Sequence, residues 1–223
     1  GYQGENKVDE NNLKKRFSVT LGSTEMSVGK NDNNSDRKNE IPQEINSGTT
    51  LEEALRAGDK FSSKTLYYGQ LKIALLGDEI LNDRDLFYET IQYLEKNEDI
   101  NESILVLGCE GKASDIMKNI LSENTSAGFY IWDFYKSGEG KNDGLVINLH
   151  ELVRAFNQNQ STLLPLISIE NENVVMDKSV IVDNYIKKGI LDSEQKSGSR
   201  WIKGLGENEI IQIECDGNYI YGN

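Results

Sequence analysis

The residue types that most often carry catalysis or bind metals are scarce in this chain. Its single histidine is His150, and its two cysteines are Cys109 and Cys215. A catalytic triad needs a histidine beside its nucleophile, and a zinc site needs several His, Cys or acidic ligands close together. One histidine and two cysteines in unrelated positions therefore predict a protein without catalytic residues, bound metal or cofactor.

Cys109 is the best candidate for a nucleophile, because it follows an apolar run and precedes a glycine turn. Neither Gly108 nor Glu110 carries the positive charge that would lower the pKa of its thiol. The segment GCEGKAS, residues 108–114, has some likeness to a phosphate-binding loop. It lacks the Gly-x-x-x-x-Gly-Lys-Ser/Thr spacing, and the carboxylate of Glu110 would repel phosphate. We interpret Cys109 as an unreactive thiol and the segment as an ordinary turn.

Acidic residues could bind calcium or act as acid–base pairs. Asp32, Asn34 and Asp36 have the spacing of a calcium-binding loop, but Arg37 stands where the turn glycine is needed and no suitably placed glutamate follows. Neighbouring carboxylates occur elsewhere, as chance predicts for a chain with 37 acidic residues. None of them lies in an apolar stretch that would raise a carboxyl pKa. We interpret these groups as solvated surface residues.

The composition excludes several classes of partner. With 24 basic and 37 acidic residues, the formal net charge is −13. Binding to nucleic acid needs a positive surface, so no nucleic-acid partner is expected. The same charge disfavours unaided binding to anionic lipid, and no run approaches the roughly 18 apolar residues that span a bilayer. The two cysteines form no disulfide framework, so we expect two unpaired thiols.

The most apolar part of the chain, residues 48–111, contains the elements that would position Cys109. Residues 71–76 and 104–107 resemble two strands that are apolar on both faces, and residues 86–94 between them have an apolar stripe at helical spacing. Strands without a polar face are usually covered by helices on both sides. Two such strands joined by a helix predict a parallel βαβ unit.

The other elements follow from capping residues and apolar periodicity. Thr50 with Glu53, Asn148 with Glu151, and Asp192 are expected to begin helices. The elements expected in chain order are a strand at 17–21, a polar loop at 29–48, helices from 51, 112 and 149, strands at 167–169 and 174–182, a short helix after 192, and strands at 210–213 and 219–221.

Together these elements predict an α+β fold with mixed α/β character. The expected first domain, residues 1–162, has a helix-covered mixed sheet, and residues 157–162 form a polar joint. The expected second domain, residues 163–223, is smaller and also mixes strands and helix.

Two stretches of the chain carry recognisable motifs. The first is TTLEEALRAGDKFSSKTLYYGQLKIALLGDEIL followed by ILVLGCEGKASDIM, and the second is VVMDKSVIVDNYIKKGILDSEQKSGSRWIKG. Both stretches resemble the Ger(x)C family, the C subunits of spore germinant receptors. The chain departs from the family pattern at Gln70, where the family usually has histidine. The residues that match are Ser62, Ser63, Tyr68, Gly69, Leu71, Lys72, Gly77, Gly111, Lys112, Ala113, Asp115, Lys188, Gly189, Leu191, Ser193, Trp201 and Gly204.

This resemblance implies a non-enzymatic lipoprotein subunit of a nutrient germinant receptor, needed for the assembly and function of the receptor in spore germination. Such a subunit would lie on the outer face of the spore inner membrane beside the membrane-embedded A and B subunits. The resemblance also implies a longer precursor with a lipid-modified cysteine and a third domain, so we expect this chain to be a soluble ectodomain fragment. It favours a short helix for residues 128–135.

The resemblance leaves the contact surface and the competing functions open. Exposed apolar patches are the expected contacts with partner subunits, and the candidates are Tyr67, Tyr68, Trp132 and Trp201, although aromatic residues more often belong to a core. The alternative function is a small-molecule-binding module with its ligand at the carboxyl ends of the strands, near Gly77 and Gly108. An enzyme such as a hydrolase is the third possibility and would need a nucleophile within reach of a base.

Overall fold

The computed structural model describes most of the chain. The described ranges are 16–22, 45–59, 71–123, 127–136, 145–202, 211–215 and 218–222, and the side chains of 45, 58–59, 121–123, 200–202 and all residues from 211 onward are not described. The polar segment 1–15, the calcium-like spacing at 32–36, and both Tyr67 and Tyr68 lie outside these ranges.

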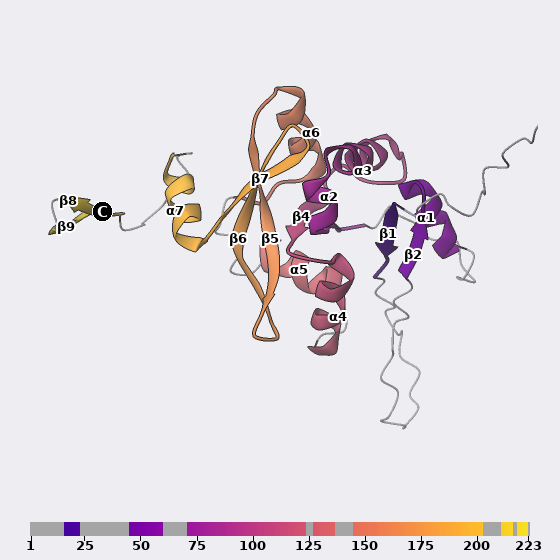
Figure 1. Ribbon diagram of the computed structural model, residues 1–223, viewed down its shortest axis with the longest axis horizontal. Coiled ribbons are helices and arrows are strands. Elements are labelled where there is room, and N and C mark those ends of the chain that lie inside the picture. The colour runs from indigo at the N-terminus through magenta and orange to yellow at the C-terminus, as the bar shows by residue number, and fades with distance from the viewer. Residues whose placement is uncertain are drawn as a thin grey trace, which may run out of the picture.

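A five-stranded mixed sheet forms the centre of the fold, with strand order β3-β4-β5-β6-β7 (Figure 1). Its parallel part contains β3 (Ile73–Leu76), β4 (Leu105–Cys109) and β5 (Thr162–Glu170), and its antiparallel part contains β6 (Asn173–Asp183) and β7 (Ile186–Leu191). Helices α2 (Asp78–Asn82) and α3 (Arg84–Lys96) join β3 to β4. Helices α4 (Ala113–Glu123), α5 (Ala127–Lys136) and α6 (Leu149–Asn157) join β4 to β5. The structure confirms the predicted parallel βαβ unit, the α+β class and the helix at 128–135.

Helices cover both faces of this sheet. Val106 of β4 packs in one core, the α3–α6 core, with Phe87 of α3 and Leu152 of α6. Its neighbour Leu107 packs in a second core, the α4–α5 core, which includes Ile131 of α5. Successive side chains of a strand point to opposite faces, so one apolar strand supplies both cores. Figure 1 shows α3 and α6 on one side of the sheet and α4 and α5 on the other.

The strand β3 lies at one edge of the sheet, which the sequence did not predict. Leu76 is buried, whereas Ile73, Ala74 and Leu75 are only half-buried, and Lys72 just before the strand is exposed. Both faces of β3 still pack on the cores, because Ala74 contacts the α3–α6 core and Leu75 contacts the α4–α5 core. An apolar pattern reports the faces of a strand and carries no information about its lateral neighbours, so it could not place β3 at an edge.

The expected boundary between residues 1–162 and 163–223 falls inside the sheet. β5 pairs with β4, and its Leu164 and Leu166 pack in the same core as Val106. Because β5 to β7 complete the sheet that β3 and β4 begin, residues 163–191 belong to the same packed unit. The predicted second domain, residues 163–223, would therefore begin inside this sheet, and the division of the chain into two domains stays a prediction.

The predicted strand near Phe17 is confirmed, but its partner was missed. β1 (Phe17–Thr20) pairs antiparallel with β2 (Ile45–Gly48), so the end of the predicted loop at 29–48 is a strand. A Cβ on Gly48 would lie 2.6 Å from the backbone nitrogen of Ala54, in the helix α1 (Leu51–Asp59). Only glycine allows this close approach, and a strand that ends in Ser and Gly gives little propensity signal.

The capping residues behave largely as predicted. The backbone N–H of Glu53 donates to the Thr50 hydroxyl at 3.1 Å, and the Glu53 carboxylate accepts from the N–H of Thr49 at 2.7 Å, one residue earlier than in the usual capping box. At α7 (Ser193–Ile202), the N–H of Gln195 donates to the Asp192 carboxylate at 2.8 Å.

The last strands include one that the sequence did not reveal. β7 contains Lys187, Lys188 and Gly189, residues that disfavour strands, so only its pairing with β6 creates it. The turn between them uses left-handed φ angles of 48° at Asn184 and 61° at Tyr185, as two-residue hairpins require. The predicted strands near the end are present as β8 (Ile211–Cys215) and β9 (Asn218–Gly222), which pair antiparallel.

We expect truncation of a side chain to lower the free energy of unfolding more in the central strand β4 than in the edge strand β3. Leu107 is 0% exposed and sits between two helices and two strands, so Leu107→Ala should lower the free energy of unfolding by about 2–5 kcal/mol. Leu75→Ala removes the same atoms from a half-buried edge position, and we expect at most about half that loss. Chemical denaturation of both variants measures the difference; equal midpoints would contradict the assigned positions of the two strands.

Candidate functional site

The carboxyl ends of β3 and β4, where the alternative function placed a ligand, are closed by backbone contacts. The N–H of Asp78 donates to the carbonyl oxygen of Gly111 at 2.9 Å, which extends the β3–β4 ladder past the strand ends. A Cβ on Gly77 would lie 3.3 Å from the same oxygen. Beside this contact, the Asp78 carboxylate accepts from Lys187 of β7 at 2.6 Å. The crevice is therefore occupied by the chain itself.

Gly108 lies in the packed interior of the fold. A Cβ there would lie 2.9 Å from Leu81, 3.2 Å from Val180 and 3.3 Å from Leu166. The glycine is needed so that these three side chains can close over β4. A ligand at Gly77 and Gly108 would have to displace core residues, and this packing argues against a binding site there.

Cys109 ends β4 inside the α4–α5 core and is fully buried. Burial is the main cause, and the negative charges of Asp78 and Asp115 act in the same direction, so that together they raise the pKa of its thiol to about 12. A nucleophilic cysteine needs a lowered pKa, so the environment acts against reactivity. The described residues thus agree with the interpretation of Cys109 as an unreactive thiol.

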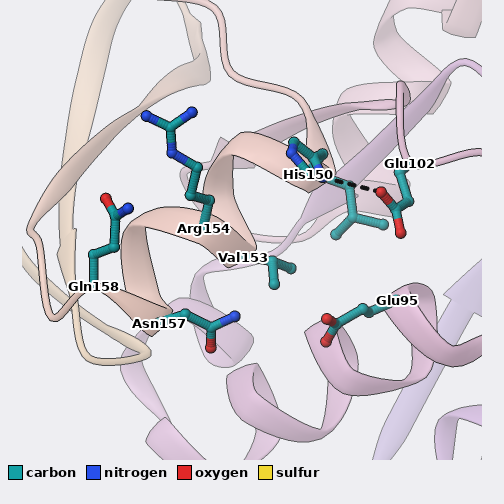
Figure 2. A pocket seen from close by; sticks show the side chains of 8 residues that line it. Glu95, Glu102, His150, Val153, Arg154, Asn157 and Gln158 are labelled. Atoms are coloured by element: carbon teal, nitrogen blue, oxygen red, sulfur yellow. Dashed lines mark hydrogen bonds and ion pairs between the residues drawn. The ribbon is translucent and has the colours of Figure 1, made fainter.

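A shallow groove of about 400 Å³ lies between α3 and α6 (Figure 2). Glu95 of α3 lies on one wall, Val153 and Asn157 of α6 lie opposite, and Arg154 and Gln158 stand at one end. Charges on exposed side chains are screened by water and hold a ligand weakly. The groove is lined by hydrogen-bond donors and acceptors and by side chains of both charges, but none of its charged side chains is buried.

His150, the single histidine, stands at the rim of this groove. Its Nδ1 lies 3.1 Å from the Glu102 carboxylate, and its side chain is 64% exposed. The helix beneath it begins with a complete capping box, in which Glu151 N–H donates to Asn148 at 2.8 Å and Asn148 N–H donates to the Glu151 carboxylate at 3.0 Å. His150 therefore lies at the surface, in the first turn of the helix that the sequence predicted to begin near residue 149.

The aromatic segment at 128–135 forms α5, and its two sides have different surroundings. Ala127, Ile131 and Tyr135 are buried in the α4–α5 core. On the other side, Phe129 is 60% exposed and Tyr130 is 37% exposed, so these two aromatic side chains lie outside the core. Residues 129–132 are apolar or aromatic over a whole helical turn, which is typical of a helix that is buried or that meets a partner, and this pattern was the signal in the sequence.

Trp132 connects the exposed and buried sides of α5. It is half-buried, its ring lies 6.2 Å from that of Phe129, and the ammonium group of Lys72 lies 5.9 Å above it. Of the four predicted contact residues, Trp132 is the one whose side chain is placed. Tyr67 and Tyr68 lie outside the described residues, and Trp201 is in α7 with a side chain that is not described.

The described part of the chain contains neither a metal-binding cluster nor a helix suited to span a membrane. Within it, no group of three or more His, Cys, Asp or Glu side chains is placed to hold a metal ion. Among the described helices, none combines the length and apolar character needed to cross a bilayer.

Comparison with known proteins gives two matches. The family model described as the spore germination protein N-terminal domain matches residues 6–169. The crystal structure of the GerBC protein is similar in fold, with a TM-score of 0.50 and 11% sequence identity, over 93% of this chain. This chain spans 62% of the GerBC chain, less than two thirds of its length. No curated protein matches the chain.

The pKa of Cys109 predicts a thiol that is protected by the native fold. In a Cys215→Ser variant, native Cys109 should react with iodoacetamide far more slowly than after unfolding, because its thiolate forms only near pH 12. The unfolded thiol ionises at its lower ordinary pKa, so this residue's contribution to stability should fall as the pH rises from about 9 towards 12. Equal alkylation rates for native and unfolded protein at neutral pH would contradict this environment.

Proposed function

This chain belongs to the Ger(x)C family of spore germination proteins, and from that premise we propose that it is part of the lipoprotein C subunit of a nutrient germinant receptor. In this proposal the chain contributes to assembly of the receptor and to its response, and it carries out no reaction itself. The observation that carries the proposal is the family match over residues 6–169.

The geometry supports a role without catalysis. Cys109, the one cysteine whose side chain is described, has a raised pKa in the core, and the one histidine pairs with Glu102 at the exposed rim of a shallow groove. A general base must lie within hydrogen-bonding reach of the group that it activates. Cys109 of β4 and His150 of α6 lie in separate surroundings, so they do not form a nucleophile–base pair.

We propose that the exposed side of α5 contacts a partner subunit. Phe129, Tyr130 and Trp132 present aromatic surface beside Lys72, and aromatic residues supply much of the binding energy at protein interfaces. A partner would cover this surface, which water otherwise contacts. Tyr67, Tyr68 and Trp201 remain further proposed contacts.

The proposed location is the outer face of the spore inner membrane, beside the membrane-embedded A and B subunits. An N-terminal lipid on the complete protein would provide the anchor. A single acyl chain gives only marginal membrane binding, so contacts with the partner subunits would have to supply the remaining retention. The net charge of −13 supports retention by the lipid and the partner subunits together, because the chain itself offers anionic lipids no electrostatic attraction.

Deletion of the gene tests the proposed role in spores of the organism that carries it. In a strain without a paralogue, spores lacking the protein should fail to germinate with nutrients, since the receptor would not assemble. The fall in optical density of a spore suspension after nutrient addition measures the response. Normal nutrient germination of the deletion strain would refute the receptor assignment.

Substitutions on α5 test the proposed contact surface. Phe129→Ser combined with Tyr130→Ser should lower the rate of nutrient germination at least roughly tenfold, which corresponds to about 1.4 kcal/mol of lost interaction. The matched control is Tyr88→Ser, an exposed aromatic of α3 that is 46% exposed. Both proteins should accumulate to normal levels. Equal germination of the double variant and the control would place the contact elsewhere.

A further inference from the structure

The outer edge of β3 carries backbone groups that pair with no other described strand. The N–H of Leu105 donates to the carbonyl oxygen of Lys72 at 2.9 Å. In a parallel pair the bonds to a neighbour come from alternate residues, so the backbone groups of Ala74 and Leu76 also point toward β4. The N–H and C=O groups of Ile73 and Leu75 therefore point away from the sheet, and β3 has no neighbour on that side among the described strands.

The two edges of the sheet differ in how they are protected. β7, the opposite edge, contains Lys187 and Lys188, and the β6–β7 pairing has a register irregularity between Ile181 and Val182. Lysines and bulges are the usual devices that stop an edge from pairing with another chain. β3 reads Ile-Ala-Leu-Leu, with neither charge nor proline and without a shift in its pairing with β4. The β7 edge of the sheet therefore carries features that disfavour pairing with another strand, whereas the β3 edge is apolar and lacks them.

The β3 edge is bordered by the aromatic side of α5. Helix α5 packs against β3, and Ile73, Leu75 and Trp132 all contact the α4–α5 core. Lys72, at the amino end of β3, places its ammonium group 5.9 Å above the Trp132 ring. A strand along this edge would have its backbone beside β3 and its side chains over Trp132.

We propose that the outer edge of β3 receives an extended segment of a partner protein as a sixth strand of the sheet. The unpaired groups of Ile73 and Leu75 specify a strand, because only an extended backbone can pair with both. The neighbouring Trp132 favours apolar side chains at alternate positions of that segment. A second copy of this chain is disfavoured, since two molecules with a charge of −13 each repel. The inference rests on the proposed function, which it deepens by naming the surface that a partner joins.

Amide hydrogen exchange distinguishes an occupied edge from a free one. The measurement compares the isolated chain with the tagged protein in the assembly that it forms in spore membranes. Exchange at Ile73 and Leu75 should slow at least about tenfold in the assembly, whereas Ala74 and Leu76 should be protected in both samples. Equal exchange of the outward amides in both samples would overturn the inference. Protection in the isolated chain that increases with concentration would also overturn it, in favour of self-association.

Two substitutions at one position separate backbone pairing from side-chain contact. Leu75→Pro removes the outward N–H, and proline is tolerated on an edge strand whose N–H faces solvent. Leu75→Ala removes the same side chain and keeps the N–H, so it is the matched control. We expect Leu75→Pro to lose recovery with the membrane assembly and Leu75→Ala to retain it, with both isolated proteins folded by circular dichroism.

The outcomes of this pair also separate the edge from the proposed function. If both variants assemble and germinate equally well while deletion of the gene abolishes germination, the edge inference fails and the receptor role stands. If Leu75→Pro unfolds the isolated protein, the hydrogen-exchange comparison of the unsubstituted chain decides the question by itself.

Discussion

The structure depends on the burial of β4 on both faces and on both edges. β4 pairs with β3 and β5, and its alternate side chains supply the α3–α6 core and the α4–α5 core. Every residue of the strand is buried. A strand in this position holds the two layers of helices together, and it leaves no space for a ligand at its carboxyl end, where Gly108 and Cys109 are enclosed by core side chains.

Because the interior is closed by this packing, the candidate functional sites lie on the surface of the protein. The carboxyl ends of parallel strands commonly bind ligands, but here the contact between Asp78 and Gly111 closes that end. The features that remain are an aromatic side of α5 and an open edge at β3, and these adjoin each other. Both suit contact with another protein, which agrees with a subunit that acts by assembly.

The sequence predicted the elements whose signals are local and missed those created by pairing. Two-sided apolar runs predicted β4, and the capping residue Asn148 predicted the start of α6, because both patterns lie within a few neighbouring residues. β2 and β7 were missed, since Ser, Gly and Lys give no strand signal until a partner is beside them. The edge position of β3 depends on its tertiary neighbours, which a pattern along the chain does not report.

We propose that this chain acts through contacts with membrane-embedded partners. The most direct test is purification of the tagged full-length protein from detergent-solubilised spore inner membranes, followed by measurement of the stoichiometry of co-purifying proteins. We expect that two membrane-embedded receptor subunits are recovered in about equal amounts with the tagged protein. Recovery of the tagged protein alone, from membranes in which those subunits are present and stable in the same detergent, would contradict it.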